Sequence, residues 1–394
     1  MFSPISSELP KAWLTPSIKN RLLTPQVLIH YQQLEANIKR MEDFAQRYQL
    51  KLRPHLKTHK TAEIAALQLK HGACGLTVAK ISEAEALVAS PVFKNQKLSI
   101  LIAYPIVGEQ NFQRVLALAK QATLLLMIDS VEQAKELHHF AEKNQTTFSV
   151  LIKIDTGLKR CGIQADTGTL QSFLQQVLPL KNILIHGLMT HAGHAYGAST
   201  TEKRKEIATY EGEALVRLKH DAQQHSGINL ADVSVGSTPT VYLSGTIPGV
   251  TEIRPGNYVF YDRTQVSLGS ATWQDCSLRV LSRVVSHPAP QRWIIDAGSK
   301  TLALDQGAHG QAGVAGYGYI VDQPHLQIAR LSEEHGVVEG NPTTPLCIGD
   351  IIEIIPNHSC PVANLANQLL VLKKEDRDEP EFETWNVMAR GRNY

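Results

Sequence analysis

The chain has 394 residues, of which 43% are hydrophobic, and its formal net charge is only +2. This length exceeds one ordinary domain and suits a large domain followed by a second one. Because the charge is near neutral and no long basic run occurs, the composition argues against a nucleic-acid partner or an anionic membrane surface. No apolar stretch approaches the roughly 18 residues of a membrane-spanning helix, so we expect no membrane insertion.

The sequence also bears on the cellular compartment. Residues 1–13 lack a basic start followed by an apolar core, so we expect no secretory signal. An odd, dispersed set of cysteines does not form a disulfide framework, which favours a reducing, cytoplasmic location. The five cysteines are Cys74, Cys161, Cys276, Cys347 and Cys360.

The first two thirds of the chain alternate helical patterns with short apolar runs. The first helix is marked by five residues at spacings of three and four: Leu34, Ile38, Met41, Phe44 and Tyr48. Eight short runs follow, and most of them are apolar on consecutive residues, which is typical of strands buried on both faces. They cover residues 51–53, 76–79, 98–102, 124–128, 148–154, 183–189, 232–235 and 250–253. Helical patterns between them, such as 131–144 and 201–226, predict a TIM-type (β/α)8 barrel.

The pattern changes near residue 266. The apolar runs 278–285, 293–296, 351–355 and 369–372 are separated by Gly, Pro and Asn, and the helical period is lost. We therefore predict a barrel domain over residues 24–265 and a mostly β domain over residues 266–394. The strand-like segment 26–29 fits either domain, so the N-terminal residues 1–30 could pack on the second.

A cationic cluster, Arg53-Pro54-His55-Leu56-Lys57-Thr58-His59-Lys60, follows the first predicted barrel strand. Catalytic residues of such barrels lie at the C-terminal ends of the strands. A lysine held among cations and partly withdrawn from water loses its proton more readily, so it can act as an imine-forming amine. The alternative from composition alone is a solvated basic loop.

Histidines and a cysteine add two further candidate sites. His191 and His194 follow a predicted barrel strand, and histidine titrates near neutral pH, so either could be a general base or a structural residue. His358 and Cys360 are two residues apart, and on an extended segment they would face the same way. Imidazole and thiolate together suit Zn²⁺, but two ligands alone also fit a structural cysteine beside a surface histidine.

Taken in order, these strings resemble a known family. The lysine after the first strand, the segment Asp155–Gly162 and Thr190-His191 are similar to alanine racemase-type enzymes, which use pyridoxal 5'-phosphate (PLP). Longer strings resemble the D-threonine aldolase and D-serine dehydratase branch of that family. They are Arg53–Lys60, Thr190–His194, Val235–Thr240, Glu334–Gly336 and Pro356–Cys360. The resemblance runs from about Thr24 to Asn393.

The resemblance implies roles for particular residues. Lys57, rather than Lys60, would form the Schiff base, while Lys60 is expected to be an exposed residue at the start of the next helix. His191 would be the catalytic base, and His335 would line the site. The remaining cofactor contacts would be Arg160 at the phenolic oxygen, Tyr196 near the ring, and two phosphate turns formed by Gly236, Ser237 and Thr238 and by Gly256 and Asn257.

The family also implies a metal and an assembly. His358 and Cys360 would hold a divalent cation, Zn, Mn or Mg, whose other ligands are water and substrate. Such proteins pair so that the β domain of one chain closes the barrel of the other, so we expect a homodimer.

The activity implied is a PLP- and metal-dependent lyase acting on small D-3-hydroxy amino acids. Pro361, Asn364-Leu365 and the ending Ala389–Arg392 favour a D-threonine aldolase, which yields glycine and acetaldehyde. Thr190–His194, the turn Gly236–Thr240 and a cysteine at position 360 favour a D-serine or D-3-hydroxyaspartate dehydratase. An amino-acid racemase or a non-catalytic PLP-binding protein are further alternatives; the metal pair speaks against the first and the long β domain against the second.

Overall fold

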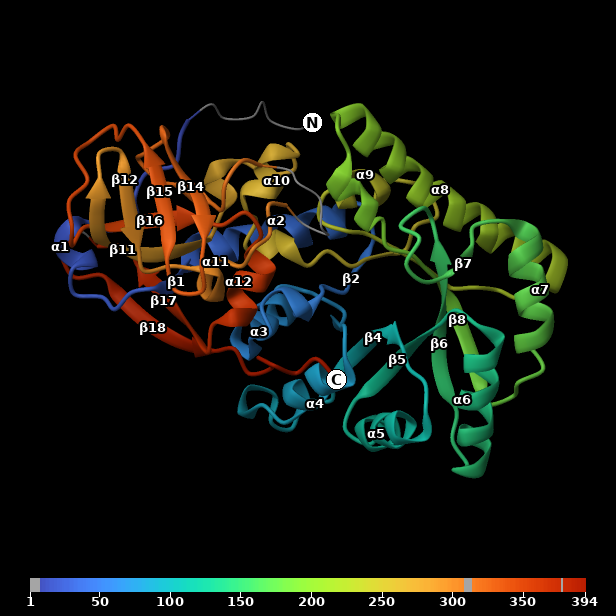
Figure 1. The fold of residues 1–394 in the computed structure, drawn as a ribbon. Coiled ribbons are helices and arrows are strands. Elements are labelled where there is room, and N and C mark those ends of the chain that lie inside the picture. The colour runs from blue at the N-terminus through green and yellow to red at the C-terminus, as the bar shows by residue number, and fades with distance from the viewer. Residues whose placement is uncertain (1–7, 308–313, 377) are drawn as a thin grey trace. The chain divides into compact units, whose positions relative to one another are not determined.

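The computed structural model describes residues 8–307, 314–376 and 378–394 (Figure 1). Its contacts divide the chain into two compact units. We call residues 40–57, 62–256 and 391–394 the barrel unit, and the described residues up to Lys39 with 58–61 and 257–390 the β unit. The chain therefore passes between the two units at five places, after residues 39, 57, 61, 256 and 390.

The barrel unit is built on one parallel sheet whose strands follow the order β2-β10-β9-β8-β6-β5-β4-β3, with β7 (Ile163–Gln164) paired to β6. An isolated parallel bridge between His55 and Thr77 links the two ends of this order. Each of the eight predicted runs contributes one strand, which confirms the predicted fold. The strands are β2 (Lys51–Leu52), β3 (Leu76–Val78), β4 (Ser99–Pro105), β5 (Thr123–Ile128), β6 (Phe148–Asp155), β8 (Ile183–Met189), β9 (Asp232–Val235) and β10 (Glu252–Ile253).

Helices alternate with these strands (Figure 1). Three of them begin at side chains that accept a backbone N–H of the first turn, namely Ser130, Asp166 and Thr200. The longest ends at Gly227, whose φ of 66° glycine adopts without strain. The helices are α2 (Tyr31–Arg47), which begins in the β unit, α3 (Ala62–Lys70), α4 (Ile81–Val88), α5 (Glu109–Ala119), α6 (Val131–Lys143), α7 (Thr167–Val177), α8 (Thr201–Ser226) and α9 (Val241–Ser244).

The interior of the barrel has an apolar layer below a polar one. Leu101, Met127, Leu151 and Met189, from four neighbouring strands, form a buried cluster. Because side chains alternate along a strand, Lys153, two residues after Leu151, faces the same interior. Lys153 is buried as well. The residues that follow the strands are therefore placed above a packed core, where barrel enzymes carry their chemistry.

The β unit holds a second sheet with the order β14-β15-β12-β11-β1-β17-β18, and β16 pairs with both β11 and β13. The segment 26–29, which fits either domain by sequence, lies in this sheet, because β1 pairs antiparallel with β11 and parallel with β17. The strands are β1 (Gln26–His30), β11 (Leu278–Ala289), β12 (Arg292–Ile295), β13 (Tyr319–Ile320), β14 (Leu326–Leu331), β15 (Gly336–Gly340), β16 (Ile351–Ile355), β17 (Gln368–Lys374) and β18 (Glu381–Asn386).

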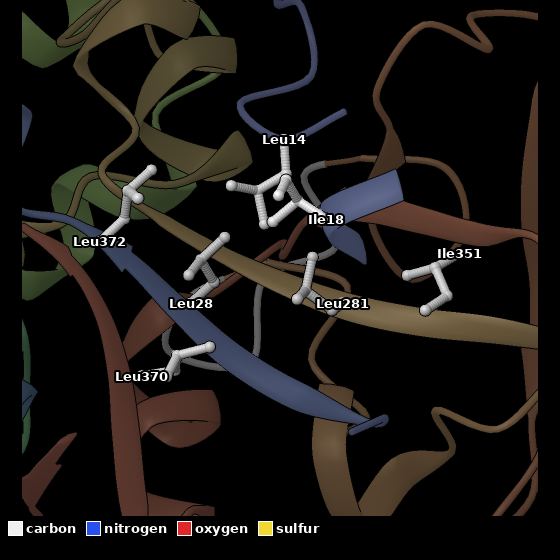
Figure 2. Close-up of a cluster of buried hydrophobic side chains, with 7 residues drawn as sticks. All are labelled: Leu14, Ile18, Leu28, Leu281, Ile351, Leu370 and Leu372. Atoms are coloured by element: carbon white, nitrogen blue, oxygen red, sulfur yellow. The ribbon is translucent and has the colours of Figure 1, made fainter. Parts of the chain in front are cut away.

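One face of this sheet packs against the N-terminal segment and its short helix α1 (Pro16–Lys19). Burying each leucine or isoleucine there stabilises the fold by about 1.5–3 kcal/mol. Glu353 fastens the same segment: its carboxylate accepts the backbone N–H of Trp13 at 3.0 Å and meets Arg279 at 2.5 Å and Lys19 at 3.1 Å. Figure 2 shows the apolar cluster, which comprises Leu14, Ile18, Leu28, Leu281, Ile351, Leu370 and Leu372.

The β unit also contains short helices that the sequence pattern does not reveal. They are α10 (Arg263–Ser267), α11 (Ser299–Leu302) and α12 (Ser359–Leu365), each too short to show a repeating apolar stripe. The expectation of an extended segment at 358–360 is therefore wrong: His358 is the residue before α12, and Cys360 lies in its first turn. The helix forms because Asp262 accepts the backbone N–H of Ser359 at 2.9 Å. None of the described helices is long and apolar enough to cross a membrane.

Candidate active site

Lys57 lies in a short 3-10 turn (Leu56–Thr58) just beyond strand β2. Its strand end is fixed on both sides, because His55 N–H donates to Pro255 O at 2.9 Å and Thr77 N–H donates to Pro54 O at 2.8 Å. Lys57 is half-buried, and its backbone N–H lies 3.3 Å from Nδ1 of His55. The structure thus places this lysine at the C-terminal edge of the barrel sheet, where the sequence predicts it.

Lys60 differs from the expectation. It precedes helix α3 with a φ of 50°, and it is buried rather than exposed. Its carbonyl accepts the backbone N–H of Ala389, so a tight turn in the β unit holds this residue. Its surroundings are therefore unlike those of an exposed helix-starting lysine.

His191 follows strand β8, and its ring is held by a backbone contact. Nδ1 of His191 lies 3.0 Å from the carbonyl oxygen of Gly236. A carbonyl can only accept, so Nδ1 carries the hydrogen and Nε2 is the basic nitrogen of the neutral ring. The arrangement gives His191 the tautomer that a general base working through Nε2 requires.

The turn that begins at Gly236 follows strand β9 and has a φ of 119° there, which favours glycine. Ser237, Thr238 and Thr240 are buried, and Oγ of Ser237 lies 3.0 Å from Oγ1 of Thr240. Gly256 follows the neighbouring strand β10. Hydroxyls and backbone amides at the ends of two adjacent strands suit an anion such as a phosphate.

The other predicted cofactor contacts lie in loops of the same unit. Arg160 is exposed, in a loop shaped by Asp155, whose carboxylate accepts the backbone N–H of Gly157 at 2.8 Å. Tyr196 is half-buried in a 3-10 turn (Gly193–Gly197). His194 packs against Gly157, since a Cβ added there would lie 3.1 Å from Nε2 of His194. Burial lowers the pKa of His194.

The barrel interior holds a buried polar network whose members Arg254, Ser234 and Glu252 were not predicted from the sequence. Arg254 is buried and donates to the hydroxyl of Ser234 and to the carbonyl of Thr190. Ser234 in turn donates to Glu252 at 2.5 Å, and Glu252 pairs with Arg53 at 2.8 Å. The sequence carries one signal for Arg254: it lies two residues before the predicted turn at Gly256, where barrel strands end in functional side chains.

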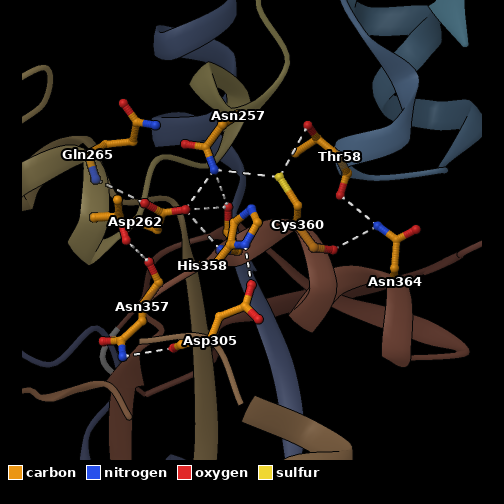
Figure 3. Close-up of polar contacts among 11 residues, drawn as sticks. Thr58, Asn257, Asp262, Gln265, Asp305, Asn357, His358, Cys360 and Asn364 are labelled. Atoms are coloured by element: carbon orange, nitrogen blue, oxygen red, sulfur yellow. Dashed lines mark hydrogen bonds and ion pairs between the residues drawn. The ribbon is translucent and has the colours of Figure 1, made fainter. Parts of the chain in front are cut away.

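His358 and Cys360 lie together in the β unit (Figure 3). Nδ1 of His358 contacts Oδ2 of Asp305 at 2.5 Å, and Sγ of Cys360 lies 3.5 Å from the hydroxyl of Thr58. Burial lowers the pKa of His358, but the Cys360 thiolate and Asp305 outweigh it and raise the pKa to about 10. Burial opposes ionisation of Cys360, yet the adjacent imidazolium lowers the pKa of this thiol. The pair therefore favours a thiolate, which is the form that binds metals.

Asn257 and Asp262 hold this pair in place (Figure 3). The side-chain amide of Asn257 donates to Asp262 at 2.6 Å and to Ser359 at 2.9 Å, and it lies 3.7 Å from Sγ of Cys360. The side chain of Asn257 thus faces the candidate metal pair, although its sequence position predicts a backbone role in a phosphate turn. Neither Asp262 nor Asp305 carries a sequence signal that marks it, because each is a single carboxylate far along the chain.

The donor set fits a divalent metal. Asp305 holds Nδ1 of His358, so a metal that displaces the proton on Nε2 could bind there beside the thiolate of Cys360. Across the described ranges, no group of three or more His, Cys, Asp or Glu side chains is arranged to hold a metal. A metal held by His358 and Cys360 would have two protein ligands, and its other positions could take water or substrate.

The predicted residues fall into both units. The barrel unit contains the predicted cofactor residues and the candidate base, namely Lys57, Arg160, His191, Tyr196, the Gly236 turn and Gly256. The β unit contains Asn257, His358 and Cys360. His335 is exposed, in the connection between β14 and β15 of the β unit. Two chain junctions relate the groups covalently: Thr58 follows Lys57, and Asn257 follows Gly256.

Residues 29–264 match the family model for the alanine racemase N-terminal domain. The chain belongs to the alanine racemase-like family. Residues 277–372 of this family member match a second model, a putative serine dehydratase domain. Both matches confirm the resemblance inferred from the sequence strings.

Its curated relatives include three enzymes of similar length. The chain is 32% identical to D-threo-3-hydroxyaspartate dehydratase of Delftia sp. (strain HT23), over 86% of this chain and 90% of that one. It is 29% identical to D-threonine aldolase of Arthrobacter sp, over 94% and 93%. It is 30% identical to D-serine dehydratase of Dictyostelium discoideum, over 91% and 95%.

Solved structures of such enzymes superimpose on nearly the whole chain. D-threo-3-hydroxyaspartate dehydratase from Delftia sp. HT23 gives a TM-score of 0.84 at 29% identity and covers 94% of this chain and 98% of that chain. D-threonine aldolase from Filomicrobium marinum gives 0.84 at 25% identity, over 95% and 98%. Another structure of the dehydratase is a cysteine-to-alanine mutant in the metal-free form.

Proposed function

We propose that this protein is a PLP- and metal-dependent lyase acting on D-3-hydroxy amino acids, and that its main reaction is cleavage of D-threonine to glycine and acetaldehyde. The observation that carries the proposal is the His358–Cys360 pair held by Asp305. A divalent metal suits a substrate with a hydroxyl on Cβ, whereas racemisation at Cα gives such a metal nothing to bind. The relatives named as aldolases and dehydratases support the same class.

The barrel unit supplies residues that would hold PLP. Lys57 would bond the cofactor, Arg160 would contact its phenolic oxygen, and the turns at Gly236 and Gly256 would take its phosphate. When bound, PLP accepts electrons from a bond broken at Cα of the substrate. The protein then decides which bond breaks, through the groups that it places around Cα and Cβ.

The β unit supplies the residues that would hold the metal. His358 and Cys360 would hold the divalent cation, which as a Lewis acid would polarise the 3-hydroxyl of the substrate. In the aldolase reaction, Nε2 of His191 takes the hydroxyl proton as the bond between Cα and Cβ breaks. The contact between Nδ1 of His191 and the Gly236 carbonyl supports this role, because it keeps Nε2 basic.

A dehydratase is the second candidate, and Cys360 favours it, because the sequence resemblance associates a cysteine at this position with the dehydratases. In that reaction Lys57 would remove the α-proton, and the 3-hydroxyl would leave as water with the help of the metal. D-Serine would then give pyruvate and ammonia, and D-threo-3-hydroxyaspartate would give oxaloacetate and ammonia. The 32% identity to a D-threo-3-hydroxyaspartate dehydratase supports this second reaction.

Product analysis separates these reactions. The purified protein is incubated with PLP, Mn²⁺ and D-threonine, D-serine or D-threo-3-hydroxyaspartate in parallel. Glycine with an aldehyde supports the aldolase; 2-oxobutanoate, pyruvate or oxaloacetate with ammonia supports the dehydratase. Conversion of the D to the L amino acid alone, or no turnover of any of the three, would refute the lyase proposal.

A further inference from the structure

Helix α8 carries one carboxylate on the face that packs against the barrel. Ala208, Leu215 and Leu218 are buried at offsets of three, four and seven residues from Glu211, which is itself fully buried. Three other acidic residues of this helix, Glu202, Glu206 and Glu213, are exposed, and Asp221 is half-buried. Because a buried carboxylate is costly unless donors surround it, the partners of Glu211 indicate what it is for.

Three donors converge on the Glu211 carboxylate. Oε1 accepts the backbone N–H of Ala192 at 3.1 Å and the backbone N–H of Gly236 at 3.0 Å. Oε2 accepts the hydroxyl of Thr240 at 2.8 Å. These donors come from two loops that follow neighbouring strands, β8 and β9, so a single side chain ties the loops together.

The two loops are those that the proposed function uses. The first holds His191, the candidate base, directly before Ala192. The second is the Gly236 turn, a candidate site for phosphate. The peptide groups of Gly236 join them: its N–H donates to Glu211, while its carbonyl is the partner of Nδ1 of His191. A displacement of Gly236 would therefore disturb the base and the turn at once.

We propose that Glu211 is a positioning residue that holds the His191 loop and the Gly236 turn in one register, and so controls both retention of the cofactor and turnover. The inference rests on the proposed function, since it concerns the loops that would bind PLP and carry the base. Glu211 acts through Ala192, Gly236 and Thr240. Its role is to supply two acceptor oxygens to these donors at a buried position.

The hydrogen-bond roles predict how substitutions rank. In Glu211→Gln, the amide oxygen still accepts both backbone N–H groups, and the new NH2 group can donate to Thr240, whose hydroxyl also lies 3.3 Å from the Ser237 carbonyl. Glu211→Asp keeps the charge but is too short to reach both backbone N–H groups. Glu211→Ala leaves all three donors without this acceptor.

The experiment compares these variants with Leu218→Ala, a control on the same buried face of α8 that removes apolar packing and no hydrogen bond. Each holoenzyme is prepared with PLP, and three quantities are measured: the melting temperature, the PLP dissociation constant from cofactor absorbance, and kcat and KM for D-threonine or the best substrate found. We expect Glu211→Ala to weaken PLP binding and lower kcat about 10- to 100-fold each, because buried donors lose their acceptor. Glu211→Gln should restore both to within about threefold.

A purely structural role would appear differently. Leu218→Ala should lower the melting temperature while leaving PLP affinity and kcat nearly unchanged. If Leu218→Ala lost as much PLP as Glu211→Ala at an equal melting temperature, or if Glu211→Gln were as defective as Glu211→Ala, the positioning role would be wrong. Glu211→Asp, which keeps the carboxylate, tests the same point if the alanine variant does not fold. A wild-type protein without PLP would instead refute the proposed function itself.

Discussion

Nδ1 of His358 lies 2.5 Å from Oδ2 of Asp305, and this contact orients the imidazole of the candidate metal pair. Asp305→Ala removes the carboxylate, so the ring can turn and the metal affinity should fall about 10- to 100-fold. Asp305→Asn keeps one acceptor oxygen and should lose less. Competition for Zn²⁺ with a chromophoric chelator measures both, and wild-type affinity in Asp305→Ala would show that Asp305 has no part in the site.

Removing the metal should abolish lyase activity and leave PLP bound, because Lys57, the Gly236 turn and Gly256 belong to a different unit from His358 and Cys360. Added Mn²⁺ or Zn²⁺ should restore turnover. Cys360→Asp should keep part of the activity and shift the preference toward harder cations such as Mn²⁺, since oxygen replaces sulfur. The control is Cys347→Asp, at an exposed cysteine, which should change nothing. Full activity after chelation, or normal metal content in Cys360→Ala, would contradict metal assistance.

Lys57 and Lys60 can be told apart by colour and activity. Lys57→Ala should lose both the visible absorbance of the bound cofactor and all turnover, because no other amine replaces the bond to PLP. Lys60→Ala should keep the absorbance, since Lys60 is held in a turn of the β unit. Absorbance spectra of the two purified variants with PLP decide the matter. A coloured, active Lys57→Ala protein would remove Lys57 from the mechanism.

Burial together with Arg254 lowers the pKa of Lys153 from 10.5 to about 7. The Lys153 ammonium is more stable in the unfolded chain than in the fold, so burying it lowers the free energy of unfolding. This cost is fully present below about pH 7 and disappears as pH rises toward 10.5. Lys153→Met removes the penalty, and its gain in the free energy of unfolding should be of order 2–5 kcal/mol at pH 6.5.

The same gain should shrink by pH 9.5, which urea denaturation at the two pH values can measure. The exposed residue Lys205 provides the control: Lys205→Met loses a charge without relieving burial. If the difference in free energy of unfolding between Lys153→Met and wild type were the same at both pH values, Lys153 would not have a lowered pKa in the fold.

Glu353 stabilises the N-terminal segment of the β unit. Burial opposes its charge, but Arg279 and Lys19 outweigh burial and lower the pKa of this carboxyl. Its contribution is therefore present above pH 4.5, its ordinary value, and is lost as pH falls through the lowered folded-state pKa. Glu353→Gln should destabilise the protein by about 3–5 kcal/mol at neutral pH, because two buried cations lose their partner.

The comparison for Glu353 is Glu339→Gln, which breaks an exposed pair with Arg292 and should cost at most about 1 kcal/mol. Urea denaturation at pH 7 and pH 3.5 gives both differences. The deficit of Glu353→Gln should be smaller at the lower pH. An equal deficit for the two variants would mean that the buried network contributes nothing beyond a surface pair.

The sequence predicted the barrel because its strands are buried on both faces. Runs such as Leu124–Ile128 and Phe148–Ile154 therefore stand out from the helices between them. The short helices of the β unit were missed for the opposite reason. Each is shorter than two full turns of periodic pattern, and α12 begins where a distant carboxylate, Asp262, accepts its first N–H.

The candidate site shows the same limit. Residues in local strings, such as Lys57 and the pair His358 and Cys360, can be recognised from sequence, because their spacing itself carries the signal. Residues that act from a distance, such as Asp305, carry none. Glu211 is intermediate: its offsets from Ala208 and Leu215 place it on the apolar stripe of α8, yet the many charges of that helix hide the stripe.

The two ends of the barrel sheet meet at a seam where a single isolated bridge, between His55 and Thr77, is assigned. Strand β2 spans only two residues, and the neighbouring backbone bonds of this seam include Cys74 N–H to Leu52 O and Thr77 N–H to Pro54 O. Short pairings of this kind favour brief local opening of the native fold without unfolding of the rest. Lys57 lies two residues beyond the bridge, so a ligand bonded to it would bind the closed form of the sheet. Local opening at this seam should therefore become rarer when PLP is bound.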